Sequence, residues 1–150
     1  MTAGAAEEAH RILDANSYMV LATADPTGRP WASPVWFARR GLAEFVWVSR
    51  RGTRHSRNIA ERAEVGIVVF DSTVPAGDGT AVYLDAVAHE VPGAELTAAL
   101  ATFADRSRAQ GLRIWQESDV TGAAEFRLYR ARTVAAFVLD DHDGRTPLEL

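Results

Sequence analysis

The sequence predicts an α+β fold in which antiparallel strands form a barrel. Three strand-like segments near the N-terminus follow one another through short turns, and strands joined in this way pair antiparallel. The later strand-like segments are grouped around isolated helical segments, whereas a parallel βαβ array requires regular alternation. From these patterns we expect about six or seven strands and about three helices.

Turn residues and apolar runs locate the strands. The segment Asp25-Pro26-Thr27-Gly28 predicts a turn between the first two strands, because proline presets φ and glycine allows positive φ. The apolar run VGIVVFD is typical of a strand that is buried on both faces. In chain order, the expected strands span residues 18–24, 30–38, 43–49, 65–71, 81–91, 126–129 and 134–139.

Three segments have helical character. Residues 3–15 predict the first helix. Thr53 is suited to cap a second helix that runs to about residue 63, since its hydroxyl group can accept a bond from a first-turn amide. An apolar stripe at i, i+4 and i+7 predicts a third helix over residues 95–110.

The length and composition are those of one globular domain. The chain has 150 residues, of which 47% are hydrophobic and 24% are charged. We see no internal repeat and no linker, so we expect residues 1–150 to form a single domain. The polar end of the chain, about residues 141–150, is expected to be loose.

Composition also excludes several classes of function. The chain has no cysteine, which excludes disulfides and thiolate metal sites, and none of its four histidines has metal-ligand spacing. The net charge of −4 does not favour nucleic acid. No secretory signal or membrane-spanning apolar run is visible. We therefore expect a cytoplasmic protein without a bound metal, a nucleic-acid partner or a membrane anchor.

The dense basic patch at residues 50–57, here called the basic turn, is the best candidate for an anion site. The predicted third strand ends here and a predicted helix begins, so free amides and the positive end of the helix dipole face outward. Arginine side chains add charge-assisted bonds that suit phosphate oxygens. The alternative is an arginine-rich turn that is merely solvated. The patch contains Arg50, Arg51, Arg54, His55 and Arg57.

The tryptophans leave two interpretations open. Each indole could stack on a planar ligand, or it could fill the core or a subunit interface. Around the second predicted strand both faces are apolar, because Trp31, Val35 and Phe37 alternate with Pro34 and Trp36. An exposed apolar surface of this kind predicts a dimer interface.

Two motifs in this order resemble a known family. The first has the form L-A-T-x-x-x-x-G-x-P and is followed by Pro34-Val35-Trp36-Phe37. The second is the string FVWVSRRGTRHSRNI, in which the basic turn leads into R-N-[IL]. Over residues 12 to about 140 the chain resembles the pyridoxamine 5′-phosphate oxidase-like, flavin-binding split-barrel family.

The resemblance implies a six-stranded antiparallel split β-barrel with flanking helices. It also implies a homodimer that binds flavin mononucleotide (FMN), or in one branch a deazaflavin, in a groove at the dimer interface. The flavin ring is expected against Pro34, Val35 and Trp36. The residues expected to hold the cofactor phosphate are Ser49, Arg50, Thr53, Arg54 and His55.

His55 departs from the family pattern. Relatives often have a phosphate-binding lysine at this position, whereas an unperturbed histidine is mostly uncharged at neutral pH. Three hypotheses follow: an FMN- or deazaflavin-dependent oxidoreductase acting on a small molecule, a flavin-binding dimer without turnover, and a dimer with a degenerate groove. The sequence assigns neither the substrate nor a catalytic proton donor.

Overall fold

The computed structural model describes residues 3–150. The helices are α1 (Ala3–Ala15), α2 (Arg54–Glu61) and α3 (Leu96–Ala109), with two short 3₁₀ helices, η1 (Gly93–Glu95) and η2 (Glu117–Val120). The strands are β1 (Tyr18–Ala24), β2 (Pro30–Trp36), β3 (Ala38–Arg40), β4 (Glu44–Arg50), β5 (Glu64–Phe70), β6 (Ala81–Glu90), β7 (Phe126–Leu139) and β8 (Arg145–Leu148).

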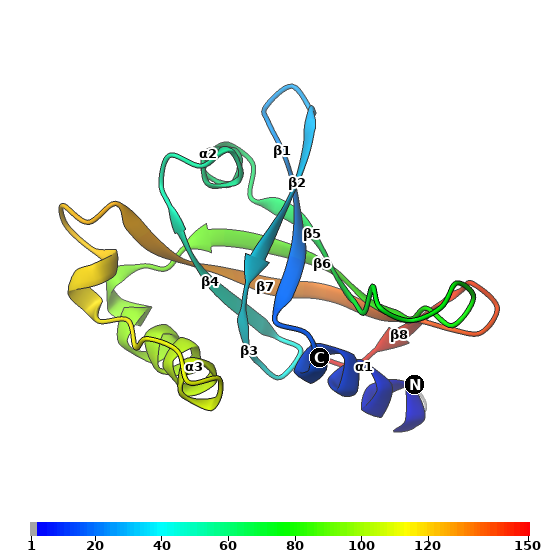
Figure 1. The fold of residues 1–150 in the computed structure, drawn as a ribbon. Coiled ribbons are helices and arrows are strands. Elements are labelled where there is room, and N and C mark those ends of the chain that lie inside the picture. Colours follow the sequence, from blue (N-terminus) through cyan, green and yellow to red (C-terminus); the bar gives the residue numbers. More distant parts are fainter. Residues whose placement is uncertain (1–2) are drawn as a thin grey trace.

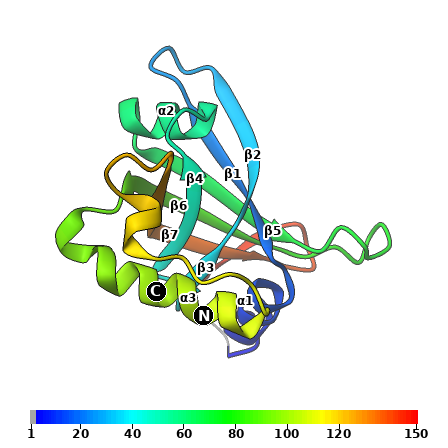
Figure 2. The same ribbon diagram turned by 60° about the vertical axis from the view of Figure 1, so that its left-hand side comes forward.

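The strands form one curled antiparallel sheet (Figures 1 and 2). Its order is β2-β1-β5-β6-β7-β4-β3, and β8 adds to β7. The two ends of this order, β2 and β3, are separated by Phe37 alone, so one bent strand lies at both edges and curls the sheet into an open barrel. With β2 and β3 taken as one strand and β8 set aside, the predicted six-stranded split barrel is confirmed.

Two strands differ from the prediction at the C-terminal end. Residues 126–129 and 134–139 belong to one continuous strand, β7, rather than to two. Arg130 and Arg132 interrupt the apolar pattern by which a strand is recognised in the sequence. Ala131 between them is nevertheless fully buried. A register shift at Asp85/Ala86 of β6 accommodates this long strand.

The prediction of a loose tail is wrong for residues 145–148. These residues form β8, which pairs with β7, and Leu148 is buried in the core. A tight turn returns the chain to the sheet: the Asp140 carboxylate accepts bonds from the amides of His142 and Gly144, and Asp143 has φ 59°. The acidic residues at this end of the chain therefore stabilise a turn.

The protein has two cores. The first fills the barrel, and α1 contributes Ala9, Ile12 and Leu13 to it. The second lies between α3 and the outer side of β3, β4 and β7, where Phe103 packs near Val46 and Leu128. In Figure 2, α3 and α1 lie together at one end of the barrel, whereas α2 lies at the other end.

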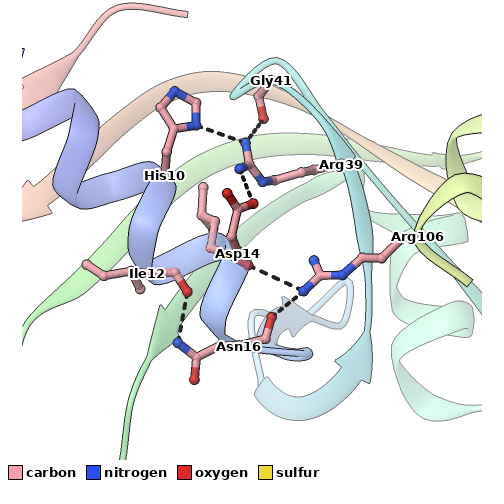
Figure 3. A network of polar contacts seen from close by, with 8 residues as sticks. His10, Ile12, Asp14, Asn16, Arg39, Gly41 and Arg106 are labelled. Atoms are coloured by element: carbon pink, nitrogen blue, oxygen red, sulfur yellow. Dashed lines mark hydrogen bonds and ion pairs between the residues drawn. The ribbon is translucent and has the colours of Figure 1, made fainter. Parts of the chain in front are cut away.

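Two arginines join α1 to the rest of the molecule (Figure 3). Arg106 of α3 donates to the main-chain oxygen of Asn16 at 2.7 Å and to that of Leu13 at 3.4 Å. Arg39 of β3 donates to the Asp14 carboxylate at 2.6 Å. A cation at the carboxyl end of a helix also compensates the helix dipole.

We expect Arg106→Met to lower the free energy of unfolding by about 1–3 kcal/mol, because it leaves main-chain oxygens at the end of α1 without a donor. Methionine retains much of the contact with Phe37, over which the guanidinium lies at 4.6 Å. Arg108→Met on the same helix removes only an exposed ion pair and should change stability by less than about 0.5 kcal/mol. Equal denaturant midpoints for the two variants would contradict this role of Arg106.

Candidate functional site

The basic turn connects β4 to α2, as the sequence predicts. Thr53 caps the helix with extended backbone angles, φ −65° and ψ 154°. Its hydroxyl oxygen accepts a bond from the Ser56 amide at 3.2 Å and lies 2.7 Å from the Ser56 hydroxyl oxygen. The predicted N-cap is therefore confirmed, but this side chain is committed to the helix.

Ser49 of β4 and His55 of the basic turn lie together in a buried position. The Ser49 Oγ atom is 2.8 Å from His55 Nε2, and the two residues are only 8% and 7% exposed. Burial lowers the pKa of His55 from its ordinary value. Burial therefore favours the neutral form of His55, whereas the lysine that relatives often have at this position would carry a charge.

The lowered pKa of His55 predicts that stability depends on pH. The unfolded chain takes up a proton on His55 below about pH 6.5, whereas the folded protein resists it. The contribution of neutral His55 to the free energy of unfolding should be fully present above that pH. It should be lost as the pH falls through the lowered pKa of the folded protein. His55→Gln should flatten this slope in denaturant titrations between about pH 8 and about pH 5. Parallel slopes for wild type and His55→Gln would refute the effect.

The arginines of the basic turn diverge. Arg50 forms an ion pair with Glu125 and lies over the Phe126 ring at 4.7 Å. Arg57 turns back to donate to the main-chain oxygen of Gly52. Arg54 has no carboxylate partner within residues 3–150, and its guanidinium carbon lies 4.3 Å from the centre of the Trp31 ring.

The start of α2 carries a positive charge that no side chain offsets. Its first turn has no acidic residue in the structure as described. The amides of Arg54 and His55 precede the first backbone bond of the helix, from Arg57 to Thr53 at 3.0 Å. The Arg54 side chain and these two amides all belong to the first turn of α2, and groups of this kind suit a phosphate or carboxylate. The fit rests on Arg54 and not on all five predicted side chains.

The three residues expected against a flavin ring do not share a face of β2. Val35 points into the barrel and is buried in the first core. Pro34 is exposed, and the Trp36 indole N–H donates to Gln110 at 3.0 Å. Contact between these residues and a ring stays a prediction. Only Pro34 has an exposed side chain for it.

Asn58 is a site residue whose role was not predicted. Its side-chain amide donates to the Thr23 hydroxyl at 3.0 Å, and both residues are buried. It lies in the R-N-[IL] motif, one helical turn after His55. The buried side of α2 consists of His55, Ser56, Asn58 and Ile59, so mostly polar contacts dock the helix that carries Arg54. The spacing of His55 and Asn58, three positions apart on a predicted helix, was the signal in the sequence that could have indicated a polar buried side.

The outer side of the sheet is apolar and open, and we call it the outer face. Side chains that face each other across neighbouring strands form two rows on it. The first row is Pro34, Val20, Val68, Tyr83, Phe137 and Pro147. The second row is Ala32, Ala22, Gly66, Asp85 and Ala135. All of these residues are exposed or half-buried, so the 65–71 strand is not buried on both faces as predicted.

Hollows in the described part of the chain also lie outside the anion-binding groups. One of about 370 Å³ adjoins α2 and is lined by Arg51, Ser56, His89 and Tyr129 among others. Another of about 1090 Å³ is lined by residues of α1 and of the loop between β5 and β6, among others. Within residues 3–150 no group of three or more acidic and histidine side chains is arranged to hold a metal ion. No helix in this range has both the length and the apolar character to cross a bilayer.

A curled antiparallel barrel with a helix inserted after β4 defines a split-barrel protein. The chain belongs to the pyridoxamine 5′-phosphate oxidase family, since the family described as "Pyridoxamine 5'-phosphate oxidase" matches residues 5–136. A search of the curated proteins found no match.

Several proteins of known structure share this fold, and their names refer to different ligands. A heme binding protein from Mycobacterium smegmatis superimposes with a TM-score of 0.76 at 25% identity, covering 99% of this chain and 59% of that protein. This chain thus spans less than two thirds of that relative. HutZ, a heme storage protein from Vibrio cholerae, gives 0.66 at 24% identity over 86% of this chain and 90% of its own. An F420 reductase gives 0.61 at 20% identity over 85% and 94%.

Proposed function

We propose that the protein is an FMN-dependent oxidoreductase that acts on a small molecule and holds the cofactor phosphate at the start of α2. The observation that carries this proposal is the Arg54 guanidinium, which lies without a carboxylate partner at a helix N-terminus that has no acidic residue. A long cationic side chain in such a place is stabilised by a bound anion. Membership of the oxidase family makes a flavin phosphate the first candidate.

Each residue of the site has a distinct role in this proposal. Arg54 and the amides of Arg54 and His55 would hold the phosphate, and Thr53 fixes the helix start at which those amides meet. The neutral Ser49–His55 pair ties α2 to β4 without adding charge. The flavin supplies the hydride chemistry, while the protein supplies position and electrostatics.

We further propose that the protein works as a homodimer joined through its outer face. A row of apolar side chains crosses several strands there, and Val20 and Val68 at its centre are only half-buried in the single chain. Small residues beside them, such as Ala22 and Gly66, allow a second sheet to approach closely. A large apolar surface of this kind on a small domain marks an interface.

A deazaflavin reductase and a heme-binding protein are the alternatives. The fold is shared with an F420 reductase, and a deazaflavin would present a phosphate to the same Arg54. Heme is favoured by the M. smegmatis relative, which aligns over 99% of this chain. His55 does not provide a free axial ligand, because its Nε2 atom already faces Ser49 in a buried position.

Visible spectroscopy tests the proposal directly. Purified protein, and apo-protein titrated separately with FMN, a deazaflavin and heme, should bind FMN most tightly and show flavin absorption. If heme binds more tightly and gives a Soret band, or if the deazaflavin binds more tightly, that cofactor and not FMN is the ligand of the protein. Absence of binding to all three would support a degenerate groove.

Turnover separates an oxidoreductase from a flavin-binding protein without activity. The FMN-loaded protein should be reduced by a nicotinamide donor and reoxidised by an acceptor faster than free FMN at the same concentration. Equal rates for bound and free FMN would favour the non-catalytic dimer.

A further inference from the structure

We infer that Trp31 is a positioning residue that holds Arg54 in place for an anionic group. This inference rests on the proposed function and concerns the same site. Arg54 has a single side-chain partner within residues 3–150, the Trp31 indole. Trp31 lies on β2, in the hairpin that rises beside α2 in Figure 1, and is 40% exposed.

The chemistry of this partner suits a binding arginine. A carboxylate would also hold the guanidinium, but it would cancel the charge and occupy the donors. An aromatic ring contacts the flat face of the guanidinium and leaves the N–H donors, which lie in its plane, free for oxygens. Arg54 is therefore held with its charge and its donors still available.

The role of Arg54 as the phosphate-binding cation of the proposed site makes this contact important. Burial against Ser49 favours the neutral form of His55, and Arg50 is paired with Glu125. An arginine that is not held loses side-chain freedom when it binds, which weakens binding. Trp31 reduces that loss for Arg54, the cation to which the proposal assigns the phosphate.

Titration of apo-protein with FMN and with riboflavin, which lacks the phosphate, tests the role. We expect Trp31→Leu to weaken FMN binding about three- to tenfold and to leave riboflavin binding unchanged. Trp31→Phe retains a ring and should recover most of the FMN affinity. In an Arg54→Gln background, Trp31→Leu should cause no further loss, since the two residues act as one unit.

Trp115 offers a matched control. Arg113 lies 4.0 Å from the centre of its ring, in a pair of the same kind outside the candidate site. Trp115→Leu should therefore leave FMN affinity unchanged in folded protein, with folding checked by circular dichroism for every variant.

The outcomes distinguish this role from the proposed function itself. An equal loss of FMN and riboflavin binding in Trp31→Leu would mean that Trp31 contacts the ring of the ligand, and would overturn the inference. Additive losses in the double variant, or unchanged FMN binding in Trp31→Leu, would overturn it as well. A wild-type protein that binds neither flavin would instead overturn the proposed function, and the role of Trp31 with it.

Discussion

Replacing Arg54 by glutamine is expected to weaken FMN binding about ten- to a hundredfold. A charge-assisted hydrogen bond contributes about 1.5–3 kcal/mol, and about 1.4 kcal/mol corresponds to a tenfold change in affinity. Two neighbouring arginines of the basic turn are engaged elsewhere, because Arg50 is paired with Glu125 and Arg57 turns back to Gly52. Fluorescence titration of apo-protein with FMN measures the loss.

A matched control removes the same charge from the other end of α2. Arg62 follows the helix and donates to the main-chain oxygen of Pro26 at 3.2 Å. Arg62→Gln should leave the FMN affinity within about twofold of wild type, because its charge lies beyond the local range of the phosphate. Riboflavin affinity should be the same in all three proteins. A loss of equal size in both variants would show that net charge, and not contact at Arg54, governs binding.

A negative charge at the centre of the outer face is expected to convert the proposed dimer into monomers. In Val68→Glu, the two copies would each bury an unpaired carboxylate at a symmetric interface, which should weaken association at least about a hundredfold. Val68 points away from the first core, so the fold of each protomer should persist. In sedimentation velocity at micromolar concentration, the Val68→Glu protein should have half the mass of the wild-type protein.

Two further variants make the dimer test specific. Ala22→Glu, in the neighbouring row of the outer face, should act in the same way as Val68→Glu. Thr97→Glu adds the same charge at an exposed position of α3 and should leave the dimer intact. A wild-type protein that sediments as a stable monomer, or a Val68→Glu protein that stays dimeric, would contradict the proposed interface.

The barrel could be predicted because its early strands carry local signals. The Asp25–Gly28 turn and the Thr53 cap depend on residues within a few positions of one another, and both are as predicted. β7 and β8 could not be located in this way. Whether arginine-rich residues 130–132 continue a strand depends on distant partners, such as Glu95, which bonds to both Arg130 and Arg132. Nothing in a short window of sequence reveals those partners.

The candidate site was predicted as a cluster, but its division of roles was not. Arg50, Arg54 and His55 are close in the sequence, yet they leave the backbone in different directions, because a strand end and a helix start orient side chains differently. The burial of His55 depends on Ser49 beneath it. The pairing of Arg54 with Trp31 joins residues on separate elements, so spacing along the chain does not indicate it.

The long strand β7 has a consequence for how the chain folds. It pairs with β6 along one edge, and with β4 and then β8 along the other. The β4–β7 pairing joins residues about 80 positions apart, and such remote contacts slow folding to about milliseconds to seconds. Until Phe126 and the residues after it leave the ribosome, β4 and β6 each present an unpaired edge. Nascent or truncated chains that stop before β7 should therefore aggregate through those edges.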